Sequence, residues 1–203
     1  MVIGITGGVG SGKSTVIDYI SIITNADVIL TDNLAKKLME PENASYIEVV
    51  KNFGDEILNP DKTINREKLG KIVFNDNEKL ELLNKCTHPY VCNYLIDYIA
   101  KNSDKLIVIE SALLFDCEIA EMCDETWYIY ASKENRRERL KTSRNYSDEK
   151  IDQMMASQKS DEFFKEKATI VIENNDMKQM QHDVYLVLKL HAHYVNGFII
   201  SNQ

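Results

Sequence analysis

The chain has 203 residues, a length that fits one large domain. Hydrophobic residues make up 44% and charged residues 28%, which are values of an ordinary folded protein and exclude wholesale disorder. The 32 aspartates and glutamates outnumber the 24 lysines and arginines, and the net charge of −8 excludes broad binding to nucleic acid or to an anionic lipid surface.

Short runs of β-branched and aromatic residues predict five strands, at 2–6, 26–30, 106–110, 126–131 and 169–173. Apolar residues at helical spacing predict helices over 13–22, 33–39, 43–53, 66–101, 133–142, 147–157 and 176–195. We expect breaks around Gly54–Asn65 and at Pro89, and an N-cap at Ser147. Strands that alternate with helices predict an α/β fold with a parallel sheet, and their unbroken apolar runs predict helices on both faces.

Nothing in the sequence indicates a membrane or secreted protein. No apolar run approaches the roughly 18 residues of a membrane span, and the first residues lack the features of a secretory signal. The four cysteines, at 86, 92, 117 and 123, have no CxxC spacing and are expected to be reduced core or surface residues. We therefore expect a cytoplasmic protein, either a monomer or a small homo-oligomer.

Residues 7–14 read GGVGSGKS and fit the pattern GxxxxGK[ST], the P-loop. The motif follows a predicted strand and precedes a predicted helix, so loop amides and the positive end of the helix dipole converge on a phosphate. Lys13 is expected to reach the β- and γ-phosphates of ATP, and Ser14 to hold Mg²⁺. The predicted ATP-binding residues are Gly8, Val9, Gly10, Ser11, Gly12, Lys13, Ser14 and Thr15.

Two further features fit a phosphate site. Glu110 ends a predicted buried strand, where a carboxylate can hold Mg²⁺ directly or through water. Four of the five arginines lie between 136 and 144, and the segment 133–144 holds six basic and two acidic residues. We expect this segment to meet a small anion. The alternative for Glu110 is an ordinary carboxylate at the end of a strand. The alternative for the basic segment is a solvated helix face.

Other segments follow in a particular order along the chain. They are Asp32 within VILTDNLAKKL, the stretch from Asn65 to Phe74, the pair His88-Pro89, the stretch Glu110–Asp116, and Gln158 followed by VIENN at 171–175. This order and spacing resembles the dephospho-coenzyme A kinase family from residue 2 to about 195. The resemblance implies ATP-dependent phosphorylation of the ribose 3′-hydroxyl of dephospho-CoA, the last step of coenzyme A synthesis.

The resemblance also implies a P-loop NTPase fold with three layers and a five-stranded parallel sheet. Its single domain would comprise a core of about 1–32, 104–132 and 168–203, a helical acceptor-binding insertion of about 33–103 and a lid of about 133–167. The lid arginine of the family pattern matches Arg139. The next arginine of the pattern falls on Ser143, so Arg144 would act from a displaced position.

Further site residues follow from the same resemblance. Asp32 would accept the proton of the attacking hydroxyl, Arg66 and His88 would line the acceptor side, and Asn174 would lie near the adenine of ATP. Asp32 also fits an N-cap for the helix over 33–39, and His88 also fits a helix-breaking corner with Pro89. Two other functions remain open: another small-molecule P-loop kinase, and a nucleotide-sensing protein without turnover.

Overall fold

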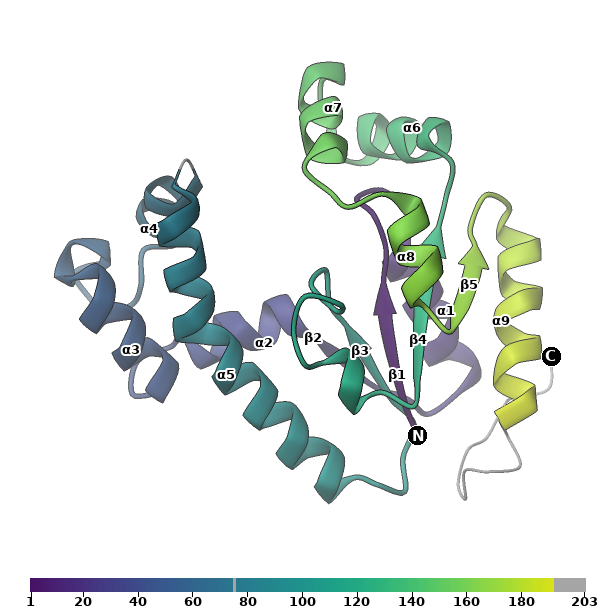
Figure 1. Cartoon of the computed structure of the whole chain (residues 1–203), viewed down its shortest axis with the longest axis horizontal. Helices are drawn as coiled ribbons and strands as arrows, with labels where there is room; N and C mark the ends of the chain where they lie inside the picture. Colours follow the sequence, from purple (N-terminus) through teal and green to yellow (C-terminus); the bar gives the residue numbers. More distant parts are fainter. Residues whose placement is uncertain (75, 192–203) are drawn as a thin grey trace. The chain divides into compact units, whose positions relative to one another are not determined.

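The computed structural model describes residues 1–74 and 76–191 (Figure 1). Its strands are β1 (Val2–Thr6), β2 (Asp27–Leu30), β3 (Ile107–Glu110), β4 (Glu125–Tyr130) and β5 (Ile170–Glu173). Its α-helices are α1 (Lys13–Ile23), α2 (Thr31–Leu38), α3 (Ala44–Phe53), α4 (Arg66–Phe74), α5 (Asn77–Lys101), α6 (Lys133–Arg144), α7 (Asp148–Ala156), α8 (Asp161–Lys167) and α9 (Met177–His191). Among the described residues, none of these helices is long and apolar enough to cross a membrane.

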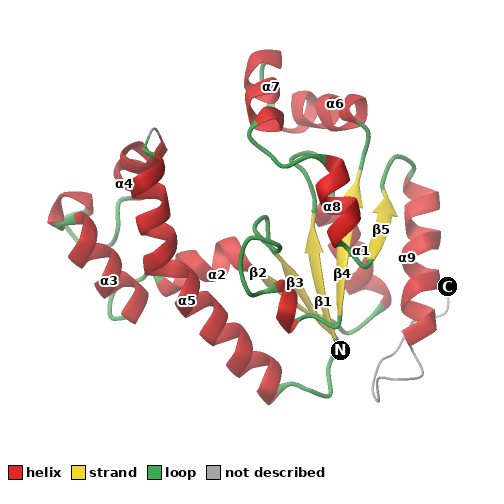
Figure 2. Cartoon of the chain, in the orientation of Figure 1, coloured by secondary structure: helices red, strands yellow, loops and turns green. Residues whose placement is uncertain are grey.

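The chain divides into two compact units, which we describe separately. The first comprises Met1–Ile29 and the described residues from Asn102 onward, and the second comprises Leu30–Lys101. The strands form one sheet in the order β2-β3-β1-β4-β5 (Figure 2). The expected α/β fold with a five-stranded parallel sheet is therefore confirmed. The assignment of a lid and an acceptor-binding insertion stays a prediction.

The strand register brings several loops to one edge of the sheet. Residue Ile5 of β1 pairs with Glu110 of β3, Thr6 pairs with Tyr128 of β4, and Tyr130 pairs with Glu173 of β5. Thr6, Glu110, Tyr130 and Glu173 are the last residues of their strands, and ligands bind at this edge in open α/β sheets. The P-loop follows β1 at this edge, and α6 follows β4.

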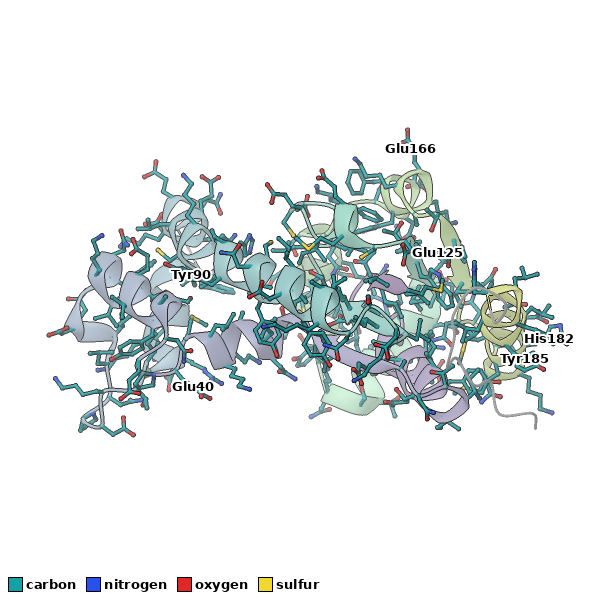
Figure 3. All side chains as sticks on the ribbon, turned by 90° about the horizontal axis from the view of Figure 1, so that it is seen from below. Glu40, Tyr90, Glu125, Glu166, His182 and Tyr185 are labelled. Atoms are coloured by element: carbon teal, nitrogen blue, oxygen red, sulfur yellow. The ribbon has the colours of Figure 1, made fainter. Side chains whose placement is uncertain are left out.

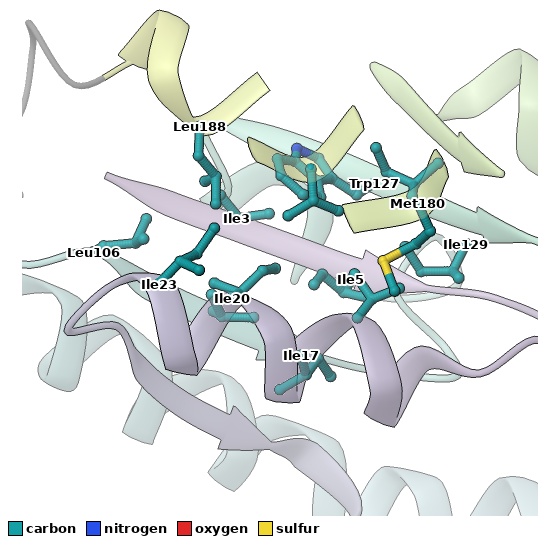
Figure 4. Close-up of a cluster of buried hydrophobic side chains, with 14 residues drawn as sticks. Ile3, Ile5, Ile17, Ile20, Ile23, Leu106, Trp127, Ile129, Met180 and Leu188 are labelled. Atoms are coloured by element: carbon teal, nitrogen blue, oxygen red, sulfur yellow. The ribbon is translucent and has the colours of Figure 1, made fainter. Parts of the chain in front are cut away.

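One face of the sheet packs against α1 and α9 (Figure 4). The cluster contains Ile3 and Ile5 of β1, Trp127 of β4, Ile20 of α1 and Met180 of α9, all fully buried. Every residue of β1 is buried, as expected for a central strand of a covered parallel sheet. Burial of this apolar area holds α1 in place directly behind the P-loop.

Helix α1 offers a matched test of this core. Ile20→Ala should lower the free energy of unfolding by about 2–5 kcal/mol, because the buried side chain leaves a cavity in a close-packed cluster. Ile22→Ala, two residues away, should change it by less than about 0.5 kcal/mol because Ile22 is 66% exposed. Urea denaturation of both variants provides the measurement. Equal losses for the two would contradict the assigned packing of α1.

Helix α8, which the sequence does not predict, lies on the other face of the sheet. Phe164 stacks on Tyr128 of β4, with ring centroids 5.0 Å apart. The hydroxyl of Ser160 accepts a hydrogen bond from the third residue of the helix and so caps it. Glu166 points away from the helix into solvent (Figure 3). Seven residues are too few to show helical periodicity.

All four cysteines are free thiols, as the sequence predicts, and Cys86 and Cys92 are buried. Cys123 packs under β1, where a Cβ on Gly4 would lie only 2.7 Å from its sulfur. Burial raises the pKa of the Cys123 thiol to about 12. This sulfur therefore acts as a packing atom rather than a nucleophile.

The second unit is helical, and its α5 corrects one expectation. Helix α5 runs without interruption through Pro89, although the sequence predicts a break there. Proline removes one helical hydrogen bond, but α5 packs against α2, α3 and α4, and Ser45 of α3 donates to the carbonyl of Cys86 at 3.0 Å. Tertiary packing thus keeps the helix intact. The helix-breaking corner that His88-Pro89 suggested is wrong.

Candidate functional site

The P-loop connects β1 to α1 in a conformation that glycine permits. Gly10 and Gly12 have φ angles of 77° and 84°, in the left-handed region that disfavours side chains. Gly12 is the N-cap of α1, and no side chain caps the helix. The first amides of α1 therefore remain available to an anion, as the sequence predicts for a phosphate-binding loop.

The structure brings Lys13 and Glu110 together at this edge. The Nζ atom of Lys13 donates to the carbonyl of Gly7 at 2.9 Å and lies 3.7 Å from Oε1 of Glu110. Both side chains are less than one-fifth exposed, so their attraction is screened less than that of a surface pair. The ammonium group thus lies over the P-loop, where a phosphate would meet it.

Ser14 and Glu110 carry a hydroxyl and a carboxylate, which are oxygen ligands of the kind that Mg²⁺ binds next to a nucleotide. Ser14 is exposed in the first turn of α1, and Glu110 ends the neighbouring strand β3. Within the described residues, no group of three or more His, Cys, Asp or Glu side chains could hold a metal ion. Mg²⁺ commonly takes one or two protein ligands and completes its shell with phosphates and water, so a hydroxyl and a carboxylate fit this ion.

Arg139 and Asn174 both contact the P-loop. Arg139 donates to the carbonyls of Ser11 and Asn174 at 3.1 and 2.6 Å. The side-chain amide of Asn174 donates to the carbonyl of Ser11 at 2.8 Å, and Asn174 is only 2% exposed. A Cβ on Gly12 would overlap this amide nitrogen. Asn174 therefore supports the loop through its side-chain amide nitrogen, and its place near the adenine of ATP stays a prediction.

The four clustered arginines have different surroundings. Arg136 is buried and Arg139 is half-buried, and both contact P-loop residues. Arg137 forms ion pairs with two aspartates of α7. Arg144 is exposed and lies 6.0 Å from the ring centre of Tyr146. Of the two predicted lid arginines, the structure places Arg139 at the P-loop and does not place Arg144 there.

A cavity of about 430 Å³ adjoins Arg139. It is lined by Asn135, Glu138, Arg139, Thr142, Ser143 and Asn175. Asn175 is fixed there, because its Oδ1 accepts from the backbone of Ser132 and from Asn135 at 2.8 and 2.9 Å. Apart from Arg139, sequence reasoning missed these residues. Those on α6 lie three, four, seven and eight positions after Asn135 along one helix face, which was the available signal, whereas Asn175 follows β5.

In the second unit, Asp32 lies in the first turn of α2. The helix begins at Thr31, two residues earlier than predicted, and its N-cap is Leu30 without a side-chain cap. Asp32 is therefore not the N-cap that the alternative interpretation required. Its side chain is exposed, and no hydrogen bond or ion pair engages it among residues 1–74 and 76–191. A carboxylate in the first helical turn is favoured by the helix dipole.

The two other predicted acceptor residues lie on α4 and α5. Arg66 is exposed at the start of α4 and lines a cavity of about 690 Å³ with Glu40, Asn59 and other residues, which do not include Asp32 or His88. His88 is half-buried, and desolvation lowers the pKa of its imidazole. His88 is therefore neutral at pH 7 and offers a hydrogen bond rather than a charge.

Comparison with known proteins places the chain in a family. A family model described as dephospho-CoA kinase matches residues 1–179. The chain belongs to the dephospho-CoA kinase family. A dephospho-CoA kinase of Fusobacterium nucleatum is 37% identical over 175 residues, which cover 86% of this chain and 90% of that protein.

Two solved structures extend this similarity to the fold. The structure of TT1252 from Thermus thermophilus has a TM-score of 0.82 and 26% identity, covering 95% of this chain and 97% of that one. A dephospho-CoA kinase from Campylobacter jejuni has a TM-score of 0.61 and 26% identity, with coverage of 93% and 96%. In this member of the dephospho-CoA kinase family, the P-loop, Lys13, Glu110 and Arg139 meet at one edge of the sheet.

Proposed function

We propose that this kinase transfers the γ-phosphoryl group of ATP to the ribose 3′-hydroxyl of dephospho-CoA and so forms coenzyme A and ADP. The observation that carries the proposal is an intact P-loop in a chain that matches the dephospho-CoA kinase family over residues 1–179. Arg139, which donates to the Ser11 carbonyl of this loop, also lines the cavity of about 430 Å³, and this supports a nucleoside site there. Its amide and hydroxyl groups suit the donors and acceptors of a base and a ribose.

The first unit would bind ATP and stabilise the charge of the transferring group. The amides at the start of α1 and the ammonium of Lys13 would face the β- and γ-phosphates. Arg139, already at the loop, would stabilise charge on the phosphoryl oxygens as the bond to ADP breaks. Ser14 and Glu110 would hold Mg²⁺, which, when bound, neutralises phosphate charge.

The second unit would bind and orient the acceptor. The exposed carboxylate of Asp32 would accept the proton of the 3′-hydroxyl and orient its oxygen for in-line attack. The guanidinium of Arg66 would pair with an anionic group of dephospho-CoA. His88, neutral because burial lowers its pKa, would contribute a hydrogen bond.

The test is an ADP-release assay coupled to NADH oxidation, with ATP, Mg²⁺ and dephospho-CoA. We expect turnover with dephospho-CoA and a product phosphorylated at the 3′-position, which mass spectrometry and ³¹P NMR identify. Turnover with a nucleoside monophosphate but none with dephospho-CoA would identify a different small-molecule kinase. Measured ATP binding without transfer to either acceptor would identify a nucleotide sensor.

A further inference from the structure

Both polar groups of the Val9 backbone, at the crest of the P-loop, are held by side chains from distant parts of the chain. The Val9 amide donates to Oε1 of Gln158 at 3.0 Å, and Nε of Arg136 donates to the Val9 carbonyl at 2.8 Å. The two side chains also join each other, since Nη2 of Arg136 donates to the same Oε1 at 2.8 Å. We call Arg136 and Gln158 the Val9 clamp.

The clamp is anchored in the interior of the first unit. Arg136 is only 5% exposed, and its Nη1 lies 3.5 Å from Oδ1 of Asp161. Asp161 in turn accepts a hydrogen bond of 2.5 Å from the hydroxyl of Tyr128 in β4. A buried guanidinium is costly unless each nitrogen has a partner, so this network fixes where Arg136 can lie. The clamp thus ties the P-loop to α6, to α8 and to the sheet.

The residues on both sides of Val9 are glycines, and Arg136 packs against them where a side chain would not fit. A Cβ on Gly8 would lie 2.5 Å from Nη2 of Arg136, and a Cβ on Gly10 would lie 2.8 Å from the carbonyl of Arg136. The clamp therefore packs against bare backbone on both sides of Val9. Since the clamp uses the Val9 amide, the phosphate must be bound by the amides that follow. The Val9 carbonyl and the Gly10 amide belong to one planar peptide, so the clamp fixes the direction of the Gly10 amide.

We propose that Gln158 and Arg136 are positioning residues that hold the P-loop in its ATP-binding conformation. This proposal rests on the proposed function in one respect: ATP must bind at the P-loop. Without the clamp, the loop samples other conformations, and the apparent dissociation constant for ATP rises in proportion to the loss of the competent form. The second unit, which we propose binds the acceptor, contains neither Arg136 nor Gln158, so the affinity for dephospho-CoA should be unaffected.

Gln158→Ala removes the oxygen that both donors share and should raise the Kd and the KM for ATP about tenfold. The kcat at saturating ATP and the KM for dephospho-CoA should stay within about twofold of wild type. Gln158→Glu keeps an oxygen at the same position and should restore the ATP affinity to within about twofold. Gln153→Ala, at an exposed glutamine of α7, is the matched control and should leave every constant unchanged.

Calorimetric titration with ATP separates this proposal from the proposed function, because it needs no turnover. An unchanged ATP affinity in Gln158→Ala would overturn the clamp, as would an equal rise of both KM values. A Gln158→Glu variant as weak as Gln158→Ala would also overturn it. Arg136→Lys keeps the charge, but a single nitrogen cannot reach the Val9 carbonyl, Gln158 and Asp161, which Arg136 contacts with three separate nitrogens, so it should weaken ATP binding as Gln158→Ala does. If wild type binds ATP without phosphorylating dephospho-CoA, the proposed function fails while these affinities still test the clamp.

Discussion

Lys13→Met should lower kcat for phosphoryl transfer by about 10²–10³-fold, the loss typical of removing one preorganised group that stabilises transition-state charge. The methionine side chain is apolar and close in length, so it keeps the packing over the P-loop and removes the ammonium. In the structure this ammonium contacts the Gly7 carbonyl and lies 3.7 Å from the Glu110 carboxylate. The coupled ADP-release assay at saturating ATP and dephospho-CoA measures the effect.

Lys178→Met is the matched control for this change. Lys178 is an exposed residue of α9 in the same unit, so the substitution removes an equal charge away from the loop. We expect it to keep kcat within about twofold of wild type. A Lys13→Met enzyme with near-normal kcat and only a raised KM for ATP would show that Lys13 contributes uniform binding rather than transition-state stabilisation.

The sequence predicts the P-loop well because the motif depends on local chemistry. Glycines at 10 and 12 allow left-handed backbone, and a strand before and a helix after them place the loop at a sheet edge. The central strands β1, β3 and β4 are equally visible, since buried parallel strands are continuous apolar runs. The position of Glu110 beside Lys13 then follows from the order of the strands.

The remaining site contacts depend on tertiary structure, which sequence spacing does not contain. Gln158 reaches Val9 across 149 positions of sequence, and Asn174 reaches Ser11 across 163. Arg136 and Arg137 are neighbours in the basic segment, yet one is buried against the loop and the other forms surface ion pairs. The sequence indicated that the arginines meet an anion but not which of them face it.

The structure favours one of the two roles that the sequence left open for Asp32. The sequence left two roles open, a helix cap and a catalytic base. In the structure, α2 begins one residue before Asp32, and its N-cap has no side-chain hydrogen bond. The carboxylate is exposed in the first turn, and an unpaired carboxylate is the form that can accept a proton. The base therefore becomes the more specific hypothesis.

Asp32→Asn should lower kcat by about 10²–10⁴-fold, the usual contribution of a positioned general base. The asparagine has nearly the same shape and no cap is lost, so the free energy of unfolding should fall by only about 0.3–1 kcal/mol, which is what the charge contributes at the helix dipole. The Kd for ATP should also remain as in wild type. Stopped-flow and steady-state assays with dephospho-CoA measure the loss, and single-turnover data separate chemistry from product release.

Asp97→Asn is the control for the charge change, because Asp97 is an exposed residue of α5 in the same unit. It should keep kcat within about twofold of wild type. A near-full kcat in Asp32→Asn would rule out the proton-acceptor role and leave only the favourable position of Asp32 at the helix dipole, whose loss costs about 0.3–1 kcal/mol of stability. The two roles thus predict different rates: the base predicts slow transfer, and the dipole alone predicts normal transfer, with the same small loss of stability in both cases.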